Sequence, residues 1–115
     1  MSVLLAIDDD PSILLAFRHI FRAPEVTVLT AATAAEGLDL VGRRHPDVVL
    51  LDINLPVVDG LEVARLIRGR YGDRVPRLIA VTGLGRPEDA RRIAAVFDHH
   101  LVKPIDFDSL SEVIG

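Results

Sequence analysis

The sequence predicts an α/β fold in which helices cover both faces of a parallel sheet. Short runs of Val, Ile and Leu alternate with amphipathic segments along the 115 residues. The runs are continuously apolar, as is typical of strands buried on both faces. Strict alternation of strand and helix favours parallel strands joined by right-handed crossovers. A chain of this length fits one domain, here residues 1–115.

The expected strands are five apolar runs, bounded mostly by charged residues, proline or glycine. They are Val3–Ile7, Val26–Thr30, Val48–Leu51, Leu78–Thr82 and Leu101–Val102. We expect an open, doubly wound sheet with strand order 2-1-3-4-5, whose switch point lies between the first and third strands.

The segments between these runs have helical periodicity and recognisable start signals. Asp10 is the expected N-cap of the first helix, with Pro11 at its first position. Residues Thr33–Glu36 match a capping box, and another helix follows Gly60. The helix that opens at Pro87 has an expected apolar face at Ala90, Ile93, Ala94 and Phe97.

Composition excludes several classes of function. The absence of cysteine removes disulfide scaffolds and thiolate chemistry, and the net charge of −4 disfavours nucleic-acid binding. No apolar run is long enough to span a membrane, and the N-terminus lacks a signal-peptide pattern. The sequence therefore predicts a cytoplasmic domain without membrane contact.

Residues that carry chemistry follow four of the five expected strands. In an open doubly wound sheet, ligands bind outside the carboxyl ends of the strands. The residues at those ends are Asp8, Asp9 and Asp10, then Asp52 and Asn54, then Thr82 and Gly83, and finally Lys103 and Pro104. Because the first and third strands are expected neighbours, Asp8, Asp9 and Asp52 should converge on one crevice.

Clustered carboxylates of this kind need a proton or a cation. Two unit charges about 4 Å apart repel by about 1 kcal/mol in water and about 4 kcal/mol at an effective dielectric of about 20. A hard divalent ion held by carboxylates and waters is the usual environment of Mg²⁺. Lys103, the only lysine, adds an ammonium, and Thr82 adds a hydroxyl. The set predicts a phosphoryl-transfer site with a carboxylate nucleophile.

Each of these residues also has a structural explanation when it is taken alone. Asp10 suits a helix cap better than a metal ligand, and the Asp59–Gly60 pair suits a turn. The four histidines are too scattered for a zinc site. The functional interpretation depends on the whole set, because separate structural roles do not explain why all of them stand at the carboxyl ends of strands.

The motifs, in this order, resemble the receiver domain of response regulators in two-component signal transduction. They are Ile7-Asp8-Asp9-Asp10-Pro11, Leu51-Asp52-Ile53-Asn54-Leu55-Pro56, Val58-Asp59-Gly60, Val81-Thr82-Gly83 and Leu101-Val102-Lys103-Pro104. The resemblance covers nearly the whole chain. It implies a flavodoxin-like, five-stranded doubly wound fold and a phosphorelay signalling domain that is not itself an enzyme.

The resemblance also implies which residues accept the phosphoryl group and hold the metal. Asp52 would be the phosphoacceptor, taking the group from a phosphohistidine of a histidine kinase or histidine phosphotransfer partner. Mg²⁺ would be held by Asp9, Asp52 and the backbone carbonyl of Asn54. Asp8 would act through a metal-bound water.

The remaining implied roles concern the phosphoryl oxygens and the switch. Lys103 would contact these oxygens, Thr82 would rotate towards them, and Pro104 would follow a cis peptide bond. Three residues before the lysine, the family commonly has Tyr or Phe where this chain has His100. Imidazole is smaller, more polar and titratable near neutrality, so we expect a weaker or pH-dependent switch.

Two features favour a domain that is fused to others in a longer chain. A histidine at the switch position resembles receivers attached to hybrid histidine kinases or multi-domain sensors. The fifth expected helix opens near Asp106 and has only about two turns before Gly115, and helices this short need docking.

Three other interpretations fit parts of the sequence. A haloacid-dehalogenase-like phosphatase also uses an aspartate nucleophile and Mg²⁺, but its nucleophile follows the first strand, whereas Asp52 follows the third. A flavin-binding electron carrier needs a phosphate cradle where this chain has three acidic residues. A degenerate receiver that only docks to partners would not need an intact set of acidic residues, threonine and lysine.

Overall fold

The computed structural model describes residues 2–20, 26–55, 58–83 and 87–103. They form a five-stranded parallel sheet in the order β2-β1-β3-β4-β5, which confirms the predicted topology. The strands are β1 (Ser2–Ile7), β2 (Val26–Ala31), β3 (Val48–Asp52), β4 (Arg77–Thr82) and β5 (His99–Val102). The helices are α1 (Pro11–Ile20), α2 (Ala34–Arg44), α3 (Gly60–Tyr71) and α4 (Pro87–Val96), with a short 3₁₀ turn, η1 (Gly72–Arg74), after α3.

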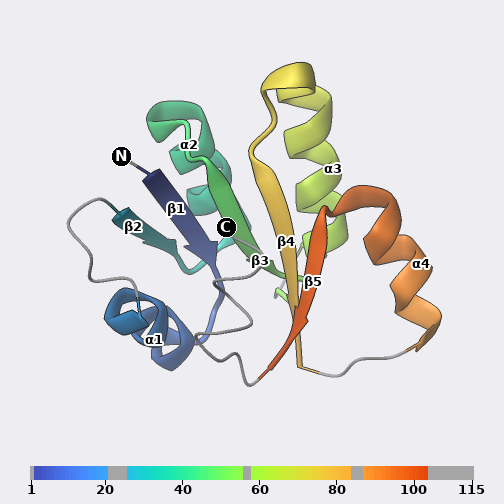
Figure 1. Cartoon of the computed structure of the whole chain (residues 1–115), viewed down its shortest axis with the longest axis horizontal. Coiled ribbons are helices and arrows are strands. Elements are labelled where there is room, and N and C mark those ends of the chain that lie inside the picture. The colour runs from blue at the N-terminus through green and yellow to red at the C-terminus, as the bar shows by residue number, and fades with distance from the viewer. Residues whose placement is uncertain (1, 21–25, 56–57, 84–86, 104–115) are drawn as a thin grey trace.

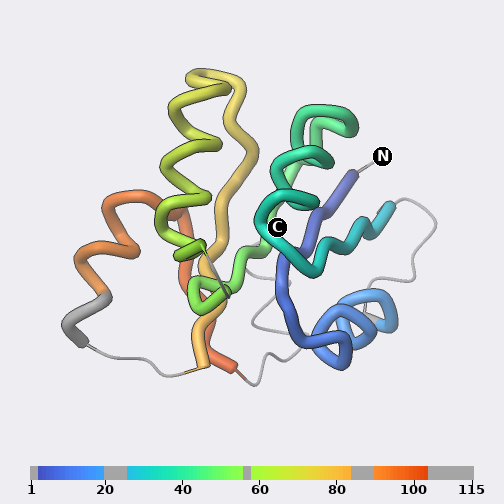
Figure 2. Tube along the Cα trace, turned by 180° about the vertical axis from the view of Figure 1, so that it is seen from behind, coloured from blue at the N-terminus to red at the C-terminus, as the bar shows by residue number. Residues whose placement is uncertain are grey.

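The sheet separates two layers of helices. α1 lies on one face, and α2, α3 and α4 lie on the other, as the front and back views show (Figure 1, Figure 2). In β1, Leu4 and Ala6 pack with Phe17 of α1, whereas Leu5 and Ile7 join the core on the side of α2 and α3. Side chains of a central strand alternate between two apolar layers, so the strand is a continuous apolar run in the sequence.

The edge strand β5 differs from the central strands. All five residues of β3 are buried, whereas β5 buries only Leu101 of its four residues. β5 begins at His99, earlier than the predicted start at Leu101, because His99 and His100 pair with Ile79 and Ala80 of β4. The predicted start was wrong because an edge strand can place polar side chains in solvent and still pair through its backbone.

Capping residues start the helices where the sequence predicted them. Asp10 Oδ1 accepts hydrogen bonds from the Ser12 amide at 2.9 Å and the Ser12 hydroxyl at 2.7 Å. Thr33 accepts from the Glu36 amide at 3.1 Å, and the Glu36 carboxylate accepts from the Ala32 amide at 2.8 Å. The returning arm of this capping box therefore reaches one residue beyond the N-cap, Thr33.

The buried face of α4 differs from the prediction. Ile93 and Phe97 are buried as expected, and Val96 joins them. Ala90 and Ala94, which were predicted to be apolar core positions, are exposed and line an open groove beside β5. The larger side chains remove more apolar area from water than the two alanines, which explains the orientation of the helix.

Two predictions fall on residues that the structure does not describe. The fifth helix near Asp106 and the cis peptide before Pro104 both lie outside the described residues. Among the helices of the described ranges, none combines the length and the apolar character needed to span a bilayer.

Candidate functional site

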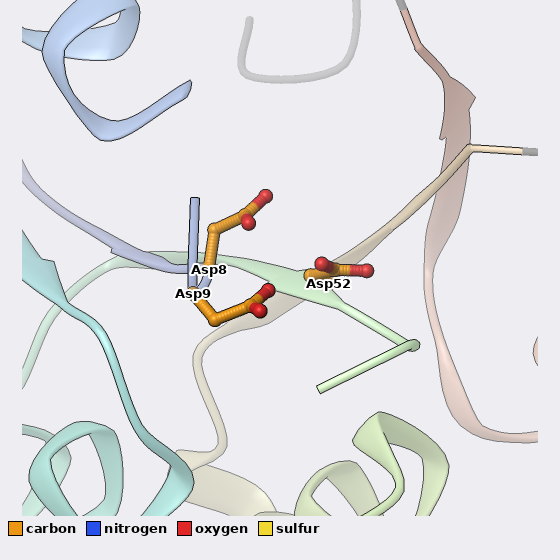
Figure 3. Close-up of side chains that lie close together, drawn as sticks. All are labelled: Asp8, Asp9 and Asp52. Carbon is orange, nitrogen blue, oxygen red and sulfur yellow. The ribbon is translucent and has the colours of Figure 1, made fainter. Parts of the chain in front are cut away.

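Three carboxylates meet at the carboxyl ends of two neighbouring central strands. Asp8 and Asp9 directly follow β1, and Asp52 is the last residue of β3. Each offers an oxygen within 4.8 Å of the other two, and Figure 3 shows the three side chains close together. Asp8 and Asp52 are buried, and Asp9 is exposed. The strand order brings these residues together as the topology predicted.

One oxygen of each buried carboxylate is held by the loop that follows it. Asp8 Oδ1 accepts a hydrogen bond from the Asp10 amide at 3.0 Å, and Asp52 Oδ1 accepts one from the Asn54 amide at 2.9 Å. The side chain of Asn54 is exposed. These bonds orient both carboxylates and leave the second oxygen of each, Oδ2, for other contacts.

Lys103 supplies the positive charge of the site. Its Nζ lies 3.0 Å from Asp8 Oδ2 and 3.5 Å from Asp52 Oδ2. The Lys103 amide donates to the Thr82 carbonyl at 2.7 Å, so the end of β4 positions the residue that follows β5. One ammonium cannot neutralise three carboxylates, and the site keeps an excess of negative charge.

Burial and charge shift the ionisation of Asp8 and Lys103. Burial raises the pKa of Asp8 and the nearby Asp52 carboxylate adds to the rise, although the hydrogen bond from the Asp10 amide and the close contact with the Lys103 ammonium oppose it. Desolvation opposes the charged form of Lys103, but its close contact with Asp8 and the negative charges of Asp52 and Asp8 outweigh this and raise its pKa. Lys103 therefore stays an ammonium, and it is the charged form of Asp8 that the site destabilises.

The donor set fits a small divalent cation. Asp8 Oδ2 is buried and, apart from its ion pair with Lys103, accepts no aligned hydrogen bond from the described residues. Such an oxygen is unfavourable unless a charge compensates it. Mg²⁺ prefers carboxylate oxygens together with water ligands, and Asp9 of this cluster is exposed to solvent. The residues present thus match the predicted metal.

Thr82 ends β4 and contacts the neighbouring strand. Its Oγ1 lies 3.0 Å from Nε2 of His100 on β5. Thr82 is 1% exposed, whereas His100 is an exposed residue. Two residues that the sequence linked only through the switch hypothesis are therefore hydrogen-bonded to each other.

Gly60 has a role that the sequence interpretation missed. The Asp59–Gly60 pair was assigned to turn chemistry, and Asp59 is indeed the N-cap of α3, accepting from the Leu61 amide at 2.9 Å. A Cβ on Gly60, however, would lie 2.5 Å from the Asp52 carbonyl oxygen and 2.5 Å from Ile53 Cα. Helix α3 therefore packs directly on the backbone of Asp52. The signal in the sequence was a glycine at the first helical position after the Asp52 loop.

Comparison with known families shows where this arrangement belongs. The family model of the response regulator receiver domain matches residues 4–115. The chain belongs to the response regulator receiver family. Receiver domains are phosphoacceptors of two-component signalling that take phosphoryl groups from histidine kinases or phosphotransfer proteins and bind Mg²⁺ at an acidic pocket.

Individual proteins are similar to this receiver domain over most of its length. The response regulator MprA of Mycobacterium sp. (strain KMS) is 33% identical over 107 residues, which cover 93% of this chain and 46% of MprA. Sporulation initiation phosphotransferase F of Bacillus subtilis (strain 168) is 28% identical over 114 residues, covering 96% of this chain and 89% of that protein. Response regulator protein TrrA from Thermotoga maritima, solved in complex with Mg(2+)-BeF, is 30% identical with a TM-score of 0.86 over 99% of this chain and 96% of TrrA.

The family assignment sets aside two of the alternative functions. The family that matches is that of the receiver domain, a phosphoacceptor signalling domain and not a classical enzyme, which disfavours both the phosphatase and the flavin carrier. The receiver domain also spans about half the length of the MprA relatives that it matches.

Proposed function

We propose that this receiver domain accepts a phosphoryl group on Asp52 in a Mg²⁺-dependent phosphorelay. The donor is a phosphohistidine on a histidine kinase or a histidine phosphotransfer domain. The supporting observation is the position of the Asp52 carboxylate, which is buried, 3.5 Å from the Lys103 ammonium and within 4.8 Å of oxygens of Asp8 and Asp9. A carboxylate nucleophile, a cation and a metal-binding acidic pair are the parts that phosphoryl transfer needs.

The proposed metal ligands are Asp9, Asp52 and the backbone carbonyl of Asn54, with Asp8 acting through a water. Bound Mg²⁺ would neutralise the carboxylates and the charge on the phosphoryl oxygens. Burial raises the pKa of Asp8, and the nearby Asp52 carboxylate adds to the rise. Together with the buried Oδ2 atom, which lacks an aligned hydrogen bond from the described residues, this supports a role for a bound cation beside Asp8.

The proposed transfer step forms one bond and breaks another. An oxygen of Asp52 attacks phosphorus while the bond from phosphorus to the donor imidazole nitrogen breaks, and the electron pair of that bond stays on the nitrogen. The product is an acyl phosphate on Asp52. The Asn54 amide holds the carboxylate in one orientation, which limits the motion needed to reach the transition state. Lys103 attracts the phosphoryl oxygens, and the Thr82 hydroxyl donates to one of them.

We also infer that the domain works in the cytoplasm as part of a longer chain, with no direct contact to nucleic acid or membrane. Its net charge of −4 disfavours a phosphate backbone as partner. Its match to 46% of MprA shows that related receivers occur within longer proteins. The competing function is a receiver that only docks to partners.

Intact-mass measurement with Mg²⁺ and a small-molecule phosphodonor separates these two functions. We expect one phosphoryl addition on the unmodified protein and none on Asp52→Asn. Asp39→Asn is the matched control, because Asp39 is exposed and pairs only at the surface with Arg43, at 3.1 Å; it should accept the group normally. An undiminished adduct on Asp52→Asn would assign a different acceptor, and no adduct on the unmodified protein would favour the docking function.

A further inference from the structure

The hydrogen bond between Thr82 and His100 joins two neighbouring strands at the edge of the site. Thr82 Oγ1 and His100 Nε2 are 3.0 Å apart. His100 pairs with Ala80 in the strand register, and Thr82 lies two residues further along β4. Both side chains therefore point to the same face of the sheet. The contact is set by strand register, and it does not depend on the conformation of a loop.

The burial of Thr82 determines which group donates and which accepts in this hydrogen bond. The residue is 1% exposed. Within the described part of the chain, His100 Nε2 is the hydrogen-bond partner of the hydroxyl. If Nε2 carried a proton, the buried hydroxyl proton would have no acceptor there, which is unfavourable. In the neutral ring, Thr82 therefore donates to Nε2, and the ring proton is on Nδ1.

Phosphoryl binding needs the same hydroxyl proton. A hydroxyl has a single proton to donate. In the proposed function of Asp52, on which this inference rests, Thr82 donates that proton to a phosphoryl oxygen. It cannot donate to His100 Nε2 at the same time. The resting contact and the phosphoryl contact therefore exclude each other as long as the imidazole is neutral.

We propose that His100 is a positioning residue that holds the Thr82 hydroxyl in the resting domain and releases it when the imidazole gains a second proton. Both ring nitrogens of an imidazolium are donors. Nε2 then donates to Thr82 Oγ1, and the hydroxyl proton becomes free for a phosphoryl oxygen. The same pair of residues thus opposes phosphoryl binding while the imidazole is neutral and permits it when the ring is an imidazolium.

The charges around His100 in the described residues are few. The groove beside it is lined from α4 and the turn after it by apolar side chains: Ala90, Ile93, Ala94 and Phe97. Asp98 and His99 line the same groove, and Asp98 pairs with Arg68 at 3.3 Å. Lys103, further along the chain, is held by Asp8 at 3.0 Å. His99 carries the neighbouring imidazole, so it needs its own control.

Binding of beryllium fluoride with Mg²⁺, as an analogue of the phosphoryl group, tests the inference with three variants. His100→Phe keeps an aromatic ring and removes the Nε2 atom that accepts from Thr82. His100→Gln keeps a hydrogen-bonding group near the position of Nε2 but does not titrate. His99→Gln is the control, because it removes the adjacent imidazole and leaves both partners of the Thr82–His100 hydrogen bond in place.

Two results are expected in these binding measurements. At about pH 8, where imidazole is neutral, His100→Phe should bind the analogue about fivefold more tightly than the unmodified protein, because the competing hydrogen bond is gone. When the pH is lowered from about 8 to about 5.5, the affinity of the unmodified protein for the analogue should rise relative to that of His100→Gln. The control His99→Gln should show the same rise as the unmodified protein.

Nitrogen-15 chemical shifts of the His100 ring test the resting contact in the unmodified protein, so this measurement does not depend on a variant that folds. Nε2 should be unprotonated at about pH 8, and its nitrogen-15 chemical shift should change on addition of the analogue. A protonated Nε2 at this pH, or the same pH dependence in the unmodified protein and His100→Gln, would overturn the inference. If the unmodified protein binds no analogue at all, the proposed function of Asp52 fails as well. If it binds but the His100 variants do not differ from it, the inference alone fails.

Discussion

The Nζ atom of Lys103 lies 3.0 Å from Oδ2 of Asp8, an oxygen that accepts no aligned hydrogen bond from the described residues. This ion pair connects the residue after β5 with the residue after β1 across the carboxyl ends of the sheet. The second contact of the ammonium, with Asp52 Oδ2, is longer, at 3.5 Å. In the metal-free domain, the main role of Lys103 is therefore that of a counter-ion to the acidic cluster.

Replacing Lys103 by methionine should destabilise the metal-free domain more than the Mg²⁺-bound one. Without the ammonium, the buried Asp8 and Asp52 carboxylates lose their compensating charge, and we expect a loss of about 1–3 kcal/mol in the free energy of unfolding in EDTA. Mg²⁺ should recover part of this loss, as urea denaturation with and without the metal would measure. Arg65→Met removes only an exposed pair with Glu62 at 3.6 Å and should change stability little. An equal loss with and without Mg²⁺ would contradict the counter-ion role.

Asp9→Ala should abolish the rise in melting temperature that Mg²⁺ produces. A ligand that binds only the native state stabilises it in proportion to RT ln(1 + [L]/Kd), so a lost metal ligand removes the effect. The metal-free variant should be at least as stable as the unmodified protein, because one of three repelling carboxylates is gone. Thermal unfolding at several Mg²⁺ concentrations would measure both results, with Asp39→Ala as the control. A full response in Asp9→Ala would place the metal elsewhere.

The raised pKa of Asp8 predicts a pH dependence of stability in the absence of metal. Because the pKa is higher in the folded than in the unfolded state, the contribution of this group to stability is present at low pH and is lost as the pH rises through the folded pKa. The side chain in Asp8→Asn cannot ionise, so this variant does not lose stability through this group as the pH rises. The melting temperature of Asp8→Asn minus that of the unmodified protein should therefore increase from about pH 4 to about pH 7 in EDTA. A difference that stays constant or decreases over this range would show that burial does not control the ionisation of Asp8.

Gly60→Ala should destabilise the domain and weaken phosphoryl acceptance at Asp52. The added Cβ would meet the Asp52 carbonyl oxygen and Ile53 Cα, each at 2.5 Å, and backbone atoms of a central strand move only at a cost of about 1–3 kcal/mol. Gly69→Ala is a matched control in the same helix, since a Cβ there has no atom within 4 Å. It should stabilise the domain by about 0.5–1 kcal/mol through helix propensity. Denaturation and intact-mass measurements on both variants would test this, and equal effects at the two glycines would contradict it.

The sequence by itself determined the sheet and the location of the site. Short continuous apolar runs are typical of strands buried on both faces, and their alternation with helices leaves few topologies other than a parallel sheet. The predicted strand order then brings Asp8, Asp9 and Asp52 to one edge, where their oxygens lie within 4.8 Å of one another. The roles of these residues in phosphoryl transfer stay predictions.

The tertiary structure alone decided which residues contact each other. Local patterns carry apolar periodicity and capping signals, but they do not contain the strand register or the closeness of helix to strand. For this reason β5 begins at a polar residue, His99, and α4 buries Val96 and leaves Ala94 exposed. The same register places the Thr82 hydroxyl on His100 Nε2, and the packing of α3 on β3 makes Gly60 necessary. These contacts join segments far apart in the chain, so their energies depend on the packed fold and not on the neighbouring residues in the sequence.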